Sequence, residues 1–251
     1  MDHITIIGVD YSTDNRKTGL ALGAWDNGKV KIADVTIASE REPAPKIIAR
    51  WLTQHRVVLL AMDAPLGWPE AMGRELSSHS AGRPLQTKAD EFFSRLTDRV
   101  VRDCIAKKPL EVGANLIART THSALRLLED LRNDMHTEIP LVWDPSEIKK
   151  TGAIEVYPAA TLIARNIKSR SNENAGEERL NMVRQLGLSI EQQALRKLVE
   201  ESPHAFDAVV CITAASDFLQ GSCIPVDDMA KAKKEGWIWV FQRSKMQGQR
   251  I

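Results

Sequence analysis

Aspartates end two apolar segments of the chain that have the character of buried strands. Asp10 follows the apolar run at residues 4–9, and Asp63 follows a second run at residues 57–62 that is closed by Ala64 and Pro65. Near-continuous apolar runs are typical of strands covered on both faces, and open α/β sheets place ligands at the carboxyl ends of their strands. If the two strands are parallel neighbours, both carboxylates lie at one edge of the sheet.

A third acid belongs to a helix near the carboxyl end. Residues 202–219 predict a helix with Ser202 as its N-cap, and His204 shares one face with Asp207. Clustered carboxylates repel one another, and a divalent cation relieves that repulsion. Oxygen ligands suit Mg²⁺ or Mn²⁺, which activate water and stabilise phosphate transition states. The residues that we expect to be metal ligands are Asp10, Asp63 and Asp207.

His204 and Glu155 are the candidates for assisting proton transfer, because Glu155 lies in a strand segment that can reach the same crevice. Each of the five residues also has a structural explanation that the sequence leaves open. Asp10 suits a hairpin cap, Asp63 a turn former and Asp207 a favourable partner of the helix dipole. His204 is compatible with a solvent-facing position and Glu155 with an ordinary strand position.

The elements that must position these residues follow the order β-β-β-α-β. Alternating or apolar segments predict strands at 4–12, 18–25 and 30–38, which form an antiparallel meander. A helix at 43–55 then leads into the strand that ends at Asp63, which lets that strand run parallel to the first. A further strand is expected at 152–158, helices through about residue 201, and a short closing strand in WIWVF (237–241). We expect Trp237 and Trp239 to pack in the core.

Residues 69–150 differ from the rest and read as a helical insertion after the fourth strand, within a single domain at 1–251. They hold a polar loop and two amphipathic segments, 89–107 and 113–135. Arg95, Arg99 and Arg102 are spaced at i, i+4 and i+7, which predicts one basic stripe on a helix. Arginine is well shaped for phosphate, although local pairing with neighbouring aspartates is the usual fate of such a stripe. Arg74 and Arg83 are further candidates for substrate contacts in the polar loop.

The order of elements, with acids after strands one and four and in the last helix, resembles the ribonuclease H fold. More narrowly, the motifs GVDYS, AMDAPLGWP with Arg74, SRLTDR, EVYPAA, HAFDAVVCITAA and EGWIWV resemble the domain of unknown function family 429, described as predicted ribonuclease H-like nucleases. The resemblance spans Ile4 to Val240, and it implies functional roles for Arg95, Asp98 and Arg99. The HxxDA segment also resembles the acidic helix of Holliday-junction resolvases, which carry Glu where Asp63 stands.

The expected fold is therefore α/β and ribonuclease H-like, with a mixed five-stranded sheet of three antiparallel strands followed by parallel strands. The expected function is divalent-metal-dependent nuclease activity on RNA or DNA. One alternative is a catalytically inactive nucleotide- or protein-binding module. A second is a relative of the actin-like and sugar-kinase ATPases, because the segment GVDYSTDNRKTG resembles their phosphate-binding hairpin. Against this alternative, the chain has no Gly-Gly dipeptide and room for only one copy of the fold.

Composition limits the partners. With 34 Lys and Arg against 33 Asp and Glu, the chain has no global field that would attract long duplex DNA, which favours a single-stranded or structured nucleic acid. Three widely spaced cysteines indicate neither a disulfide framework nor a zinc ribbon. A cytoplasmic protein without a membrane partner is expected, because the sequence has neither a signal-peptide pattern nor a run of 18 apolar residues.

Overall fold

The computed structural model describes residues 3–113, 115–168 and 175–243. Its centre is a six-stranded mixed sheet in the order β5-β4-β1-β2-β3-β6. The strands are β1 (Ile4–Asp10), β2 (Gly19–Asp26), β3 (Lys29–Ile37), β4 (Val58–Asp63), β5 (Thr151–Glu155) and β6 (Ser189–Ile190). The first three are antiparallel, β4 is parallel to β1 and β5 is parallel to β4. This is the ribonuclease H-like arrangement that the sequence predicts. The sixth strand is a correction: β6 pairs with β3 over two residues, too few to produce a periodic pattern.

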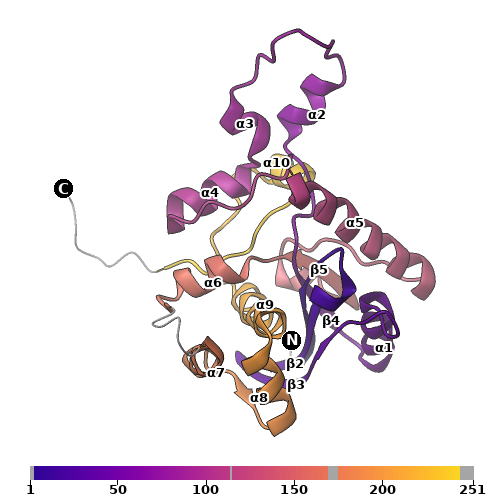
Figure 1. Cartoon of the computed structure of the whole chain (residues 1–251), viewed down its shortest axis with the longest axis vertical. Coiled ribbons are helices and arrows are strands. Elements are labelled where there is room, and N and C mark those ends of the chain that lie inside the picture. Colours follow the sequence, from indigo (N-terminus) through magenta and orange to yellow (C-terminus); the bar gives the residue numbers. More distant parts are fainter. Residues whose placement is uncertain (1–2, 114, 169–174, 244–251) are drawn as a thin grey trace, which may run out of the picture.

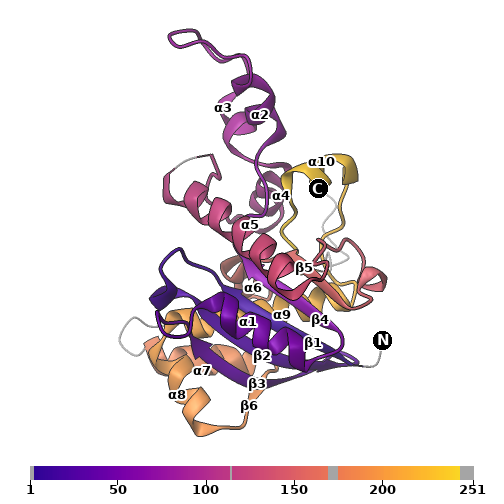
Figure 2. The same ribbon diagram turned by 90° about the vertical axis from the view of Figure 1, so that its right-hand side faces the viewer.

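Helices cover both faces of the sheet, which explains why its central strands are apolar throughout. The helices α1 (Ala44–Gln54) and α5 (Asn115–Met135) pack on one face, with Ile7 and Leu60 in the shared core. The helix α9 (Pro203–Leu219) packs on the other face against Ile6 and Leu59, and α6 (Pro158–Ala164), α7 (Ala175–Gln185) and α8 (Gln193–Glu201) lie around it (Figures 1 and 2).

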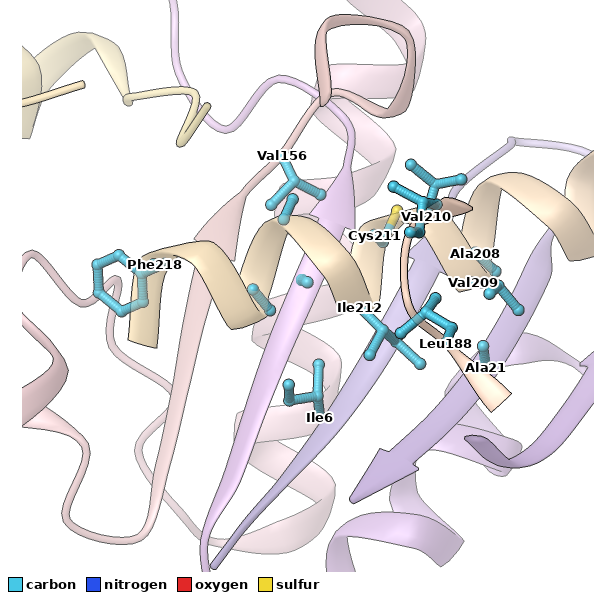
Figure 3. Close-up of a cluster of buried hydrophobic side chains, with 14 of the residues drawn as sticks. Ile6, Ala21, Val156, Leu188, Ala208, Val209, Val210, Cys211, Ile212 and Phe218 are labelled. Carbon is cyan, nitrogen blue, oxygen red and sulfur yellow. The ribbon is translucent and has the colours of Figure 1, made fainter. Parts of the chain in front are cut away.

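The helix α9 is buried over most of its length. Figure 3 shows its apolar side chains, including Val209 and Ile212, directed into the cluster that also contains Ile6. The helix backbone comes very close to the sheet because glycines face it. A Cβ on Gly8 would lie 2.1 Å from the carbonyl oxygen of Ala208, and one on Gly19 would lie 2.0 Å from that of His204. Glycine at these two positions therefore sets the distance between α9 and strands β1 and β2.

The segment between β4 and β5 is helical, with α2 (Glu70–Leu76), α3 (Ala89–Phe93), α4 (Leu96–Ile105) and α5. Figure 1 shows α2 and α3 projecting away from the sheet. The single helix expected at 89–107 is instead two helices, because the backbone is extended at Ser94 and Arg95. The carboxylate of Asp98 accepts a hydrogen bond from the Arg95 N–H at 2.9 Å, which begins a new helix at that point. Short 3₁₀ turns lie at Asn15–Lys17 and Pro145–Glu147.

The chain returns to the sheet after α10 (Met229–Glu235). The closing strand expected at 237–241 is not regular: Ile238 makes a single bridge to Glu155, and Phe241 makes one to Cys223. Trp237 and Trp239 are buried, as expected for core residues. Through the described residues, no helix combines the length and apolar character needed to cross a membrane.

Candidate active site

Asp10 and Asp63 lie side by side at the carboxyl edge of the sheet. They are direct register partners in the parallel pairing of β1 with β4. Both are the last residues of their strands, and each is somewhat less buried than the apolar residues that precede it. The structure thus brings together the two acids that the sequence places at the ends of its apolar runs.

The start of α9 brings His204 and Asp207 to the same edge. The Ser202 hydroxyl accepts a hydrogen bond from the Ala205 N–H at 3.2 Å, which caps the helix as expected. Close packing on Gly19 then positions the first turn, and the Nδ1 atom of His204 lies 2.7 Å from Oδ2 of Asp10. Asp207 lies three residues further along the helix, close enough for the charge of Asp10 to raise its pKa.

The three carboxylates share a site in which negative charge is poorly compensated. Burial raises the pKa of Asp63 well above its usual range, and the negative charges of Asp10 and Asp207 raise it further. Burial, with Asp10 adding to it, raises the pKa of Asp207 to about 7 against the opposing effects of His204 and Arg179. Burial also raises the pKa of Asp10, although its hydrogen bond to His204 acts the other way. Such a site favours protons or a cation.

The donor set fits a hard divalent cation, because it consists of carboxylate oxygens: the charges of Asp10 and Asp207 raise the pKa of Asp63, and the charge of Asp10 raises that of Asp207. Across the parts of the chain that the structure describes, no group of three or more His, Cys, Asp or Glu side chains already has the spacing of a metal site. In this arrangement, the carboxylate of Asp10 is hydrogen-bonded to His204. Cys211, one turn beyond Asp207, does not join the metal-ligand set, because burial raises the pKa of its thiol well above the usual range and the thiol donates to the Val9 carbonyl.

Glu155 and Arg95 belong to a buried ion-pair network beside the acid cluster. Two guanidinium nitrogens of Arg95 donate to Glu155 at 2.7 and 2.8 Å, and two donate to Asp98 at 2.9 and 3.2 Å. The Leu66 N–H donates to the second oxygen of Glu155 at 2.9 Å. Burial raises the pKa of Glu155 while the Arg95 charge opposes the rise. Glu155 nevertheless lines the same cleft as Asp10 and Asp63, and its charge adds to the rise in the pKa of Asp63. A part for Glu155 in proton transfer stays a prediction.

The exposed arginine stripe that the spacing predicts is not formed. Arg95 and Asp98 are 1% and 3% exposed and pair with each other, so neither is part of an exposed stripe. Arg102 is at the surface but is paired with Asp90 and Asp103 at 2.7 and 3.0 Å. Arg99 is half-buried and donates to the Ser94 carbonyl. One side of their helix packs against the protein, so residues on the same helical face differ in their exposure to solvent.

Arg74 and Arg83 are exposed, one in α2 and one in the loop that follows it. They remain candidates for contacts with substrate phosphates.

A cleft of about 250 Å³ opens beside the carboxylates. Its lining includes Asp10, Asp63 and, from residues that the sequence patterns did not single out, Tyr11, Pro65, Pro109, Leu110, Ile117, Thr120 and Tyr157. Tyr11 directly follows Asp10 and Tyr157 lies two residues after Glu155, so their position after strands is a signal that could have identified them. Ile117 and Thr120 of α5 do not follow a strand, so nothing in the sequence pattern pointed to them.

The fold and the acids Asp10 and Asp63 define the class of protein: an α/β protein with a ribonuclease H-like sheet and carboxylates at the carboxyl ends of two parallel strands. Residues 8–231 match the family described as "Protein of unknown function (DUF429)", and the chain belongs to that family.

Among solved structures, the chain is similar to the one described as "T. thermophilus RuvC in complex with Holliday junction substrate". The two are 15% identical, the match covers 89% of this chain and 99% of that chain, and the TM-score is 0.38. That likeness is too weak to assign a function. No curated protein matches the sequence.

Proposed function

We propose that this protein is a divalent-metal-dependent phosphodiesterase that acts on nucleic acid. The observation that carries the proposal is the pairing of Asp10 with Asp63 at the ends of adjacent parallel strands. Asp207 is close enough for the charge of Asp10 to add to the burial that raises its pKa to about 7. Concentrated negative charge of this kind is costly in a fold unless it binds a cation. Perturbed carboxylates beside a cleft are typical of catalytic sites.

Each residue of the site has a role in this reaction. Asp10, Asp63 and Asp207 would hold Mg²⁺ or Mn²⁺, which supplies positive charge beside the scissile phosphate when bound. His204 is 36% exposed in its side chain and bonded through Nδ1 to Asp10. Its Nε2 is thereby left to exchange a proton with water or with the leaving oxygen. The carboxylate of Asp10 also holds the imidazole in one orientation.

Nucleic acid as the substrate is supported by the exposed arginines of α2 and its loop, and the balanced charge of the chain limits which kind of nucleic acid it binds. A net charge of +1 provides no strong field for long duplexes. Arg74 and Arg83 offer local phosphate contacts on the projecting part of the insertion. We therefore favour a single-stranded or structured nucleic acid over a long duplex.

Calorimetric titration of Mn²⁺ into the wild type and the Asp10→Asn and Asp207→Asn variants tests the site. Both substitutions remove charge but keep shape, so we expect folded proteins with at least tenfold weaker Mn²⁺ binding and little or no cleavage of RNA and DNA panels. Asp26→Asn, at the exposed end of β2, is the matched control and should leave both properties unchanged.

Other outcomes would change the assignment. An Asp10→Asn variant that does not fold would make Asp10 structural. A wild type that binds no Mn²⁺, with or without oligonucleotide, would support the catalytically inactive binding module instead.

A further inference from the structure

The cleft beside the acids has walls that metal binding does not explain. Away from Asp10 and Asp63 it is bounded by rings and aliphatic groups, from Tyr11, Pro65, Leu110, Ile117 and Tyr157, with the Thr120 hydroxyl among them. Ile117 and Thr120 belong to α5, which lies between the sheet and the projecting α2 and α3 in Figure 2. The insertion therefore builds one wall of the cleft, and the ends of the strands build the other.

The lining restricts what the cleft can hold. The carboxyl groups of Asp10, Asp63 and Glu155 repel an anion, and the one arginine of the lining, Arg95, is already paired with Glu155 and Asp98. An anionic occupant is therefore disfavoured, and the apolar rings and aliphatic groups of the walls suit an uncharged group. A volume of about 250 Å³ is below the range of roughly 300–1,000 Å³ that buries drug-sized ligands, so it suits a single ring system.

The two tyrosines are held in place before anything binds. The Tyr11 hydroxyl is hydrogen-bonded to Ser123 Oγ at 2.6 Å, which ties the residue after β1 to α5. Tyr157 directly precedes α6 and packs against the buried cluster that contains Val101, Ala160 and Ala164. Rings fixed in this way lose little conformational freedom when a flat group stacks on them.

We propose that this cleft binds one unpaired nucleobase of the substrate while an adjoining phosphate lies at the carboxylates. A nucleobase is a neutral flat ring that stacks on tyrosine, and it is joined to a phosphate of the kind that the neighbouring site would cleave. The inference rests on the proposed phosphodiesterase function. It identifies the substrate as single-stranded or locally unpaired nucleic acid, because a base within a duplex is stacked and out of reach.

The probe is a fluorescent trithymidylate with methylphosphonate linkages, compared with the same molecule lacking its central base. Its neutral linkages are not repelled by the acids and need no metal, so fluorescence anisotropy reports the contribution of the base alone. We expect the wild type to bind the intact probe about tenfold more tightly than the abasic one. Ile117→Trp, which fills the cleft, should abolish the difference, whereas Leu116→Trp, on the exposed side of the same helix, should preserve it.

Equal binding of the intact and abasic probes by the wild type, or equal effects of the two tryptophan substitutions, would overturn the inference. If Ile117→Trp fails to fold, Leu110→Glu places a charge at the exposed rim and should give the same loss. Cleavage with Mn²⁺ is measured separately on natural oligonucleotides. Base-dependent binding without cleavage would overturn the proposed phosphodiesterase function and support the nucleobase site. Cleavage without base-dependent binding would support the phosphodiesterase function and overturn the nucleobase site.

Discussion

Asp207 shows how far the surroundings of a single residue determine its chemistry. On a solvent-exposed helix an aspartate titrates near its usual pKa of 3.8, whereas here burial and the charge of Asp10 raise the pKa to about 7. Near neutral pH the free site is therefore poised between holding a proton and holding a cation. His204 and Arg179 reduce this effect without cancelling it.

The raised pKa of Asp207 predicts a pH-dependent stability for the metal-free protein. Because the folded state holds the proton more tightly than the unfolded state, this stabilisation is complete below pH 3.8 and is lost as the pH rises through about 7. Relative to the wild type, Asp207→Asn should therefore gain about 2 kcal/mol in free energy of unfolding between about pH 5 and about pH 8. Urea denaturation in a chelating buffer measures this. A difference between the two proteins that does not vary with pH would contradict the raised pKa.

At the scale of elements, the decisive contact is that of α9 with the β1–β2 hairpin. The helix can bring His204 to Asp10 only because Gly19 and Gly8 carry no side chain where its carbonyl oxygens approach. The site thus depends on two glycines that take no part in its chemistry.

Gly19→Ala should displace the first turn of α9, because the added Cβ would meet the His204 carbonyl oxygen at 2.0 Å and backbone must move. We expect a loss of about 1–3 kcal/mol in free energy of unfolding, as for other overpacked sites, together with reduced cleavage. Gly73→Ala is the control: it lies in α2 with no atom within 4 Å of the new Cβ, so it should be neutral or stabilise by up to about 1 kcal/mol. Equal effects of the two substitutions on stability and cleavage would show that the close contact at Gly19 does not position His204.

At the scale of the whole molecule, a buried carboxylate joins the insertion to the end of the chain. The two oxygens of Glu235, which is 1% exposed, accept hydrogen bonds from the Glu70 N–H at 2.8 Å and the Leu96 N–H at 2.6 Å. One side chain therefore caps the starts of both α2 and α4. The Arg95 network lies beside it, since Arg95 also donates to the Glu235 carbonyl at 3.2 Å.

Glu235→Gln should loosen the insertion while leaving the sheet intact, because one acceptor becomes a donor that faces a buried N–H. We expect a loss of about 1–3 kcal/mol in free energy of unfolding and faster amide hydrogen exchange in α2 and α4, with the exchange in β1 and β4 unchanged. Glu201→Gln is the control: Glu201 is exposed and forms an ion pair with Lys197 at 3.7 Å, so the substitution should change stability by less than about 0.5 kcal/mol. Faster exchange throughout the sheet would show that Glu235 supports the entire fold.

The sequence by itself determined the features that depend on neighbours along the chain. Apolar runs predict the central strands and their order, the acids that end those runs predict the pairing of Asp10 with Asp63, and Ser202 predicts the start of α9. These signals are local, because periodicity and capping involve residues within a few positions of one another.

Only the tertiary structure decided which charges lie inside and what surrounds the site. Arg95 pairs with Glu155, 60 positions away, so helical spacing could not show that it is buried. The cleft likewise joins the ends of three strands to α5, and the two-residue β6 exists only through its pairing with β3. Ion pairs, cavities and short edge strands arise from contacts between distant segments, and no local pattern in the sequence encodes them.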